Sequence, residues 1–472
     1  MTLTTINPST GETLESYAET SEEQVDVILD DAHLAASKWR TTPVAARADA
    51  VRGIADALRK NRQSLAELGT LEMGKPIGES LAEVDKCAGA CDWFAENGPA
   101  FMAAEPVKTE SVLTEVTYVP LGVLFAIMPW NYPYWQVIRA IAPALTAGNV
   151  VVLKHAPSTT GCALALGDLV ESAGLPKGSF SVIVAGFEQT PVISERIIAD
   201  DRVSAVTLTG STGAGRAVAA LAGRALKKTV LELGGSDPFI VLADADVEAA
   251  ANNAVRSRFQ NTGQSCIATK RVIVANSIAD QFNELLLAGV RQLKVGDPMQ
   301  PDTKIGPLAR SDLRDIVERQ VNESVKLGAR VLIGGKPADR PGFFFEPTVL
   351  DHTTPEMPVW NEEVFGPAVP VARVEDADEA VELANETRFG LGSNLWTSDL
   401  EKGRLIASRL DAGFTAINGF TASDPRLPFG GVKDSGYGRE LSHYGMHEFV
   451  NIHSVVTNGP KGQAGQDQPT TE

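Results

Sequence analysis

The stretch from Val203 to Gly215 reads VSAVTLTGSTGAG and joins two signals directly. Its first half is an apolar, β-branched run, which predicts a buried strand over residues 203–208. Its second half is rich in glycine and opens a predicted helix, whose N-terminal amides could bind a pyrophosphate. The glycine spacing from Gly210 to Gly215 is G-x-x-x-x-G and differs from the usual dinucleotide fingerprint. The stretch therefore predicts a strand–loop–helix unit, and a phosphate site only if other motifs support it.

The same alternation recurs along the chain. A β-rich segment at 122–128 precedes a helical pattern that runs to about residue 145, and an apolar run at 149–154 precedes another at about 160–173. Strands that alternate with helices in this way imply a parallel, doubly wound sheet. The second half of the chain shows the same alternation of strand and helix patterns, without obvious sequence repetition. The sequence therefore predicts an α/β protein with more than one domain.

Composition narrows the class of protein. The chain has 472 residues, 43% of them hydrophobic, and a formal charge of −18. This acidity argues against nucleic acid and against an anionic membrane surface as partners. No apolar run is long enough to span a bilayer, and the N-terminus lacks the features of a signal peptide. Four cysteines do not form a disulfide framework, so we expect a cytoplasmic protein.

Three side chains in separate segments have the chemistry of a catalyst. Cys266 ends the polar loop QNTGQSC, Glu232 lies in the strand-like run TVLEL, and Asn131 lies in PWNYP at a predicted strand-to-helix junction. A thiol can attack a carbonyl carbon, an amide can stabilise the resulting oxyanion, and a carboxylate can activate water. These are the groups needed to oxidise an aldehyde to an acid.

Each of these residues also has an ordinary structural interpretation. A single cysteine is usually a packed hydrophobe, but the neighbours of Cys266 are small or amide residues that offer little apolar packing. Glu232 could be a solvated carboxylate, but its run is apolar, and burial would raise its pKa toward neutrality. Asn131 could equally cap the helix that follows it.

Six motifs in chain order resemble those of the aldehyde dehydrogenase superfamily, and the resemblance extends from about residue 5 to 457. It implies a Rossmann-type doubly wound coenzyme domain, an α/β catalytic domain and a small β flap for oligomerisation. The motifs are Pro129-Trp130-Asn131, Gly210-Ser211-Thr212-x-x-Gly215, Glu232-Leu233-Gly234-Gly235, Gly263-Gln264-Ser265-Cys266, Glu362-Glu363-Val364-Phe365-Gly366-Pro367 and Pro428-Phe429-Gly430-Gly431-Val432-Lys433-x-Ser435-Gly436.

The resemblance implies a role for each motif. It makes Cys266 the nucleophile, Glu232 the base and Asn131 part of the oxyanion hole, and it implies no metal ion. The residues that it implies for the coenzyme are Trp130, Lys154, Ser158, Gly210, Ser211 and Gly215, together with Glu363 at the nicotinamide ribose and Phe365 near the ring.

The coenzyme is expected to be NADP or NAD, with NADP favoured. Family members usually have Lys-Pro-Ser-Glu after the apolar strand, and here the segment is Lys154-His155-Ala156-Pro157. The acidic residue that grips the 2′-hydroxyl of NAD and repels a 2′-phosphate is therefore missing. Lys154 could pair with that phosphate. The segment looks like that of the short bacterial succinate-semialdehyde dehydrogenases.

The substrate residues are also implied by this resemblance. Arg139 stands where those enzymes carry an arginine for the substrate carboxylate, Trp135 is one helical turn before it, and Ser423 lies in a loop that often supplies a hydroxyl. Against this, a second arginine that is common in that group is Gln260 here. Arg139 could also be a simple surface arginine or one that pairs within the core. Broader aliphatic aldehydes and glutarate semialdehyde remain alternative substrates.

Two other functional classes compete with hydrolytic aldehyde oxidation. An enzyme of the same fold could release an acyl-CoA, but members of that kind typically lack the carboxylate that Glu232 supplies. A non-catalytic protein on this fold would have no need of Cys266, Glu232 and Asn131 together.

We expect three structural parts. The coenzyme domain is predicted over 1–106 and 128–231 and the catalytic domain over 232–440. Segments 107–127 and 441–458 are expected to form an oligomerisation element, because their β-rich sequences look like unpaired edges. A homodimer or homotetramer follows from this expectation. The tail over 459–472 has no periodicity and is predicted to be disordered.

Overall fold

The first of two large sheets lies in the N-terminal half of the computed structural model, which describes residues 2–459. Its strand order is β17-β9-β8-β5-β6-β7, and all pairs are parallel except that between β17 and β9. The winding direction reverses between β5 and β8, which is where doubly wound sheets bind ligands. The strands are β5 (Val123–Met128), β6 (Val150–His155), β7 (Phe180–Ile183), β8 (Val203–Thr209), β9 (Lys228–Glu232) and β17 (Gly436–Tyr437).

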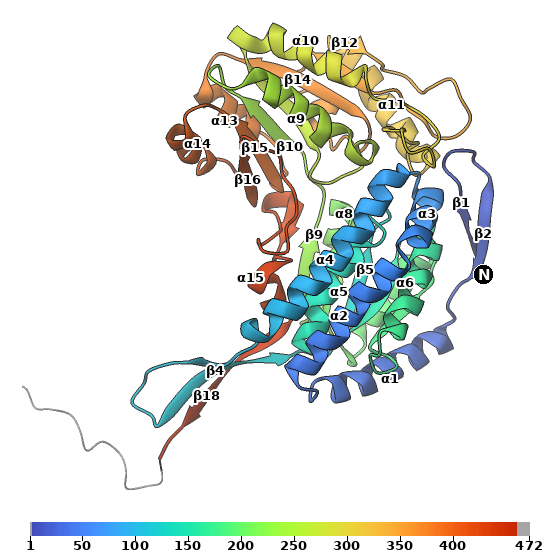
Figure 1. The fold of residues 1–472 in the computed structure, drawn as a ribbon, viewed down its shortest axis with the longest axis vertical. Coiled ribbons are helices and arrows are strands. Elements are labelled where there is room, and N and C mark those ends of the chain that lie inside the picture. Colours follow the sequence, from blue (N-terminus) through green and yellow to red (C-terminus); the bar gives the residue numbers. More distant parts are fainter. Residues whose placement is uncertain (1, 460–472) are drawn as a thin grey trace, which may run out of the picture.

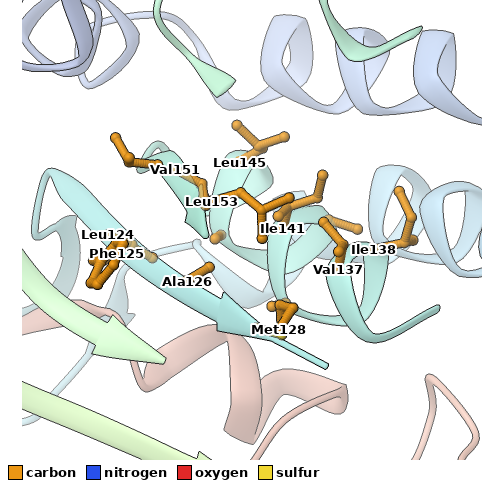
Figure 2. Packing of buried hydrophobic residues seen from close by; sticks show 14 of the residues in the cluster. Leu124, Phe125, Ala126, Met128, Val137, Ile138, Ile141, Leu145, Val151 and Leu153 are labelled. Atoms are coloured by element: carbon orange, nitrogen blue, oxygen red, sulfur yellow. The ribbon is translucent and has the colours of Figure 1, made fainter. Parts of the chain in front are cut away.

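Helices cover this sheet on both sides (Figure 1). Every residue of α5 is buried, because this helix packs against β5 and β6 and is covered by α2 and α4. Figure 2 shows Val137, Ile141 and Leu145 of α5 facing apolar side chains of the strands. Helix α1 begins with a capping box formed by Ser21 and Gln24. The helices are α1 (Glu22–Trp39), α2 (Val44–Lys60), α3 (Arg62–Met73), α4 (Ile77–Phe101), α5 (Trp135–Ala147), α6 (Thr160–Ser172), α7 (Gln189–Ala199) and α8 (Thr212–Arg224).

The second large sheet forms the other lobe in Figure 1 and has the order β12-β13-β14-β11-β10-β15-β16. Only β12 runs antiparallel to its neighbour. Its strands are β10 (Asp237–Val241), β11 (Thr269–Ala275), β12 (Arg330–Ile333), β13 (Thr348–Asp351), β14 (Ala368–Val374), β15 (Gly392–Trp396) and β16 (Phe414–Ile417). Its helices are α9 (Val247–Phe259), α10 (Ala279–Val290), α11 (Ser311–Lys326), α12 (Pro358–Asn361), α13 (Ala377–Asn385) and α14 (Leu400–Ala407).

A narrow antiparallel sheet extends away from both lobes (Figure 1). Strand β18 pairs along its whole length with β4, and the short β3 pairs on the other side of β4. Ile452 and Val456 expose more than half of their side chains there. The remaining elements are β1 (Thr2–Ile6), β2 (Thr13–Ala18), β3 (Glu105–Pro106), β4 (Leu113–Pro120), α15 (Ser442–His447), β18 (Val450–Thr457) and the 3-10 turns η1 (Pro157–Thr159), η2 (Gln260–Gly263), η3 (Asn276–Ile278) and η4 (Lys433–Ser435).

The structure moves one predicted boundary. The segment 107–127 was expected to belong to the projecting element, but residues 123–127 lie in β5, a central strand of the first sheet. Their apolar side chains are buried in the core of that lobe, so they belong with the first sheet. Disorder was predicted for the tail over 459–472. Its residues from 460 onward lie outside the described part of the chain.

Shortening a buried side chain of β6 should destabilise the core of the first lobe. Leu153→Ala removes a fully buried side chain and should lower the free energy of unfolding by about 2–5 kcal/mol. Leu34→Ala makes the same chemical change on α1, where the side chain is 61% exposed, and should change stability by less than about 0.5 kcal/mol. Denaturant titration of both variants checks this, and equal losses would contradict the packing described for β6.

Candidate active site

The loop that carries Cys266 has an unusual backbone. Asn261 and Thr262 have φ values of 53° and 54°, and Gly263 follows with 73°. Left-handed conformations cost non-glycine residues about 1–3 kcal/mol each, and a β-branched threonine is particularly disfavoured. The loop therefore needs strong contacts to hold its shape.

An amide cluster supplies these contacts. The carbonyl oxygen of Gln264 accepts hydrogen bonds from the side-chain amides of Asn131, at 3.1 Å, and Asn261, at 3.0 Å. The Asn261 amide also donates to the carbonyl oxygen of Asn131, at 2.8 Å. Helix α5 begins only at Trp135, so Asn131 is not its N-cap. The cluster joins the segment after β5 to the nucleophile loop of the other lobe.

Two glycines allow the chain to pack closely around this loop. A Cβ atom at Gly235 would lie 2.5 Å from the carbonyl oxygen of Cys266, and a Cβ at Gly234 would collide with the carboxylate of Glu363. The Glu-Leu-Gly-Gly motif therefore needs its glycines because the Cys266 loop and Glu363 both approach its backbone.

Cys266 is partly accessible, whereas Cys87, Cys91 and Cys162 are buried, and all four are free thiols. Burial of the sulfur raises the pKa of Cys266 to about 11, although the Lys270 ammonium lowers it. Lys270 donates hydrogen bonds to the carbonyl oxygens of Ser265, at 2.7 Å, and Cys266, at 2.6 Å. The thiol is therefore protonated at neutral pH, and its proton must be removed before it can attack.

Glu232 is the last residue of β9 and is 2% exposed, as its apolar run predicted. Within residues 2–459, neither carboxylate oxygen has a hydrogen-bond partner. Burial raises the pKa of Glu232 well above its ordinary value, and the nearby Glu440 carboxylate raises it further. A raised pKa makes a carboxylate a stronger base than a solvated one, which suits general base catalysis.

One cavity of about 240 Å³ opens beside Cys266. It brings together Cys266 and the three predicted substrate residues, Trp135, Arg139 and Ser423. Glu232 and Asn131 are not among its lining residues; the Glu232 carboxylate lies against Gly430 instead.

The charge of Arg139 is already compensated. Its guanidinium forms a buried ion pair with Glu440 and lies 4.6 Å from the ring centre of Phe429. Arg139 also donates to the hydroxyl of Thr209 at 3.3 Å. The structural alternative for Arg139 is thus present in the fold, even though the residue lines the cavity.

On the coenzyme side, Trp130 and Phe365 meet edge to face, with ring centres 5.6 Å apart. Glu363 accepts a hydrogen bond from the amide of Gly235 at 3.0 Å and lies 3.4 Å from the Lys270 ammonium. These residues come from both lobes.

The predicted phosphate residues lie at the carboxyl ends of β6 and β8. Ser211 caps α8 by accepting from the amide of Ala214, and Gly210 and Gly215 frame this helix start. The hydroxyl of Ser158 is buried without a hydrogen-bond partner in the described part of the chain. Burial lowers the pKa of Lys154 to about 8, and no carboxylate within residues 2–459 pairs with its ammonium. A free cation and an orphaned hydroxyl fit a ligand phosphate.

The sequence prediction missed three residues of the site, namely Lys86, Lys270 and Glu440. A signal for Lys86 was present, because Glu79, Glu83 and Lys86 follow helical spacing on one face of α4 and all line the cavity. Lys270, four residues after Cys266, is the second residue of β11 and is followed by Arg271 and an apolar run. Nothing local marks Glu440, since its partner Arg139 is distant in the chain.

Two absences can be stated for residues 2–459. No group of three or more His, Cys, Asp or Glu side chains is placed to hold a metal ion. Within the same range, no helix is long and apolar enough to cross a membrane.

Comparison with known proteins places this site in context. The model of the aldehyde dehydrogenase family matches residues 1–455. Succinate semialdehyde dehydrogenase [NAD(P)+] Sad of Escherichia coli is 47% identical over 95% of this chain and 96% of its own length. Succinate-semialdehyde dehydrogenase [NADP(+)] 1 of Mycobacterium tuberculosis is 47% identical over 96% of this chain and 99% of its own. The crystal structure of the Streptococcus pyogenes succinic semialdehyde dehydrogenase with NADP+ superposes with a TM-score of 0.93, at 37% identity, over 97% and 100% of the two chains.

Alkylation of the folded protein should modify one thiol. Iodoacetamide should react with Cys266 and spare the three buried cysteines. Because the pKa of Cys266 is about 11, the rate should rise about tenfold per pH unit between about pH 7 and pH 9. Peptide mass spectrometry measures this, with Cys266→Ala as the unreactive control. A rate that levels off near neutrality would contradict the electrostatics described.

Proposed function

Since the chain belongs to the aldehyde dehydrogenase family, we propose that it oxidises succinate semialdehyde to succinate with NADP or NAD. The observation that carries the proposal is the cavity itself, in which the Cys266 thiol shares a wall with the cationic side chains of Lys86 and Arg139. An aldehyde at one end and a carboxylate at the other match this arrangement.

The residues of the chain divide the reaction between them. The Cys266 thiol gives its proton to water, the resulting thiolate attacks the aldehyde carbon, and the new oxyanion accepts a hydrogen bond from the Asn131 amide. The Asn131 amide has two hydrogens and uses one of them for the Gln264 carbonyl oxygen, so the second remains for the substrate. A bound nicotinamide coenzyme would supply the acceptor for the hydride that leaves the carbon held by Cys266, and Glu363 and Phe365 would hold its nicotinamide end. Glu232 then takes a proton from the water that releases succinate.

For the coenzyme, NADP is the favoured choice. Lys154 and Ser158 have free polar groups that a 2′-phosphate can engage. His155 is buried, its pKa is lowered to about 4 by that burial, and it is therefore neutral. Glu19 lines the cavity beside Ser158, but its carboxylate accepts a hydrogen bond from the amide of Gly186. NAD can still bind, since none of these contacts requires the phosphate.

We also propose a homodimer or homotetramer and a division into the coenzyme, catalytic and oligomerisation parts. The exposed Ile452 and Val456 on a projecting sheet support an interface with a second copy. The cytoplasm remains the proposed location, which four free thiols support.

The substrate and coenzyme can be tested together. The wild-type enzyme should have a kcat/KM for succinate semialdehyde about ten- to a hundredfold above that for butanal, because only the first has a carboxylate to pair with. Its KM for NADP should not exceed its KM for NAD. Absorbance at the reduced-nicotinamide band measures both. A preference for butanal would reject the substrate, and a KM for NAD well below that for NADP would reverse the coenzyme preference.

Removing the base should separate the two half-reactions. Glu232→Gln should give a burst of reduced coenzyme and then stall, because water attack has lost its proton acceptor. Cys266→Ala should give neither burst nor turnover, while its coenzyme affinity stays close to that of the wild type. Stopped-flow absorbance and fluorescence titration record these effects. Unchanged steady-state turnover in Glu232→Gln would contradict the role of Glu232.

A further inference from the structure

Four charged side chains line the substrate cavity: Glu79, Glu83, Lys86 and Arg139. Three of them are engaged elsewhere in the protein. Glu83 pairs with Lys75 and accepts hydrogen bonds from the backbone amides of Tyr134 and Trp135. Arg139 pairs with Glu440, and Glu79 accepts a hydrogen bond from the backbone amide of Asn261. Burial also raises the pKa of Glu79 to about 7, so that it is only partly charged at neutrality.

Lys86 is different from these three. In the part of the chain that the structure describes, no carboxylate lies within ion-pair distance of its ammonium. Its side chain faces the cavity and is accessible to solvent. Burial of its surroundings and the neighbouring Arg139 lower its pKa to about 8, which leaves most of it charged at pH 7.

Two of the predicted substrate residues hold this ammonium in place. Its Nζ atom donates to the hydroxyl oxygen of Ser423 at 2.6 Å and lies 4.2 Å from the ring centre of Trp135. Trp135 is itself fixed, because it is 3% exposed and its amide donates to Glu83 at 2.8 Å. An ammonium has three hydrogens, so Lys86 keeps donors free for a ligand.

We propose that Lys86, together with the hydroxyl of Ser423, binds the distal carboxylate of the substrate and determines the enzyme's specificity. The inference rests on the proposed function, because it assigns the carboxylate of the same substrate to a residue. Arg139 then acts as a positioning residue, which holds Glu440 near Glu232 and closes the cavity wall with Phe429. Its buried ion pair would have to break before it could bind a carboxylate with its full charge, which is costly.

Neutral and conservative substitutions at Lys86 test this assignment. Lys86→Met keeps the length of the side chain and removes the charge, and Lys86→Arg keeps the charge. For Lys86→Met, the ratio of kcat/KM for succinate semialdehyde to that for butanal should fall about ten- to a hundredfold, mainly through KM. Lys86→Arg should recover most of the ratio. Lys177→Met, at an exposed surface lysine, is the matched control and should leave the ratio unchanged.

A binding measurement removes the dependence on turnover. Succinate should slow the alkylation of Cys266 by iodoacetamide in the wild type and in Lys86→Arg, because its carboxylate would anchor it in the cavity. In Lys86→Met about tenfold more succinate should be needed for the same protection.

The outcomes separate the two proposals. If the wild type does not prefer succinate semialdehyde, the proposed function fails, while succinate protection still reports on Lys86. If the wild type prefers it and Lys86→Met changes neither the ratio nor the protection, the assignment to Lys86 is overturned. Equal losses of kcat/KM on both aldehydes would also overturn it, since they would indicate a structural role.

Discussion

The amide cluster of Asn131, Asn261 and Gln264 is the interaction on which the rest of the site depends. It fixes a loop with two left-handed non-glycine residues, and it ties that loop to the segment after β5. Cys266 comes from one lobe and Asn131 from the other, so their relative position is set by these hydrogen bonds. These hydrogen bonds offset the strain of the loop, and the Asn131 amide uses one of its two hydrogens for the Gln264 carbonyl oxygen.

Charged residues that have a counter-charge within the protein differ from those that are free to bind a ligand. Lys75 with Glu83 and Arg139 with Glu440 are buried pairs, and each charge has its counter-charge. Lys86 and Lys154 have no such partner in residues 2–459, and each faces a cavity or crevice at which a ligand anion would supply it. A lone buried charge such as that of Lys154 is costly in a folded protein, and Lys86, although accessible to solvent, presents its ammonium to the substrate cavity; both positions therefore point to binding. Glu232 is also buried without a partner in the described residues, and burial raises the pKa of its carboxyl group.

The alternation of strands and helices was predictable from the sequence, because hydrophobic periodicity and glycine loops are local signals. The strand at 203–209, the helix of Trp135–Ala147 and the capping box at Ser21 all follow from such signals. The motifs also identified the residues around Cys266, and the burial of Glu232 followed from its apolar run.

The remainder depends on contacts between distant segments. Lys86 meets a serine 337 residues away, and Arg139 is paired with Glu440 from another part of the fold. No local pattern predicts which of two cations at a cavity will be neutralised by the protein. The boundary error at 107–127 has the same origin, because the short loop between β4 and β5 separates a projecting strand from a central one.

The most direct measurement is the mass of the Cys266 peptide after Glu232→Gln is mixed with succinate semialdehyde and NADP and then quenched in acid. The account predicts a succinyl adduct on Cys266, because the thioester forms and water cannot release it. An unmodified Cys266 peptide, obtained while reduced coenzyme accumulates, would show that oxidation proceeds without covalent attachment and would contradict the account.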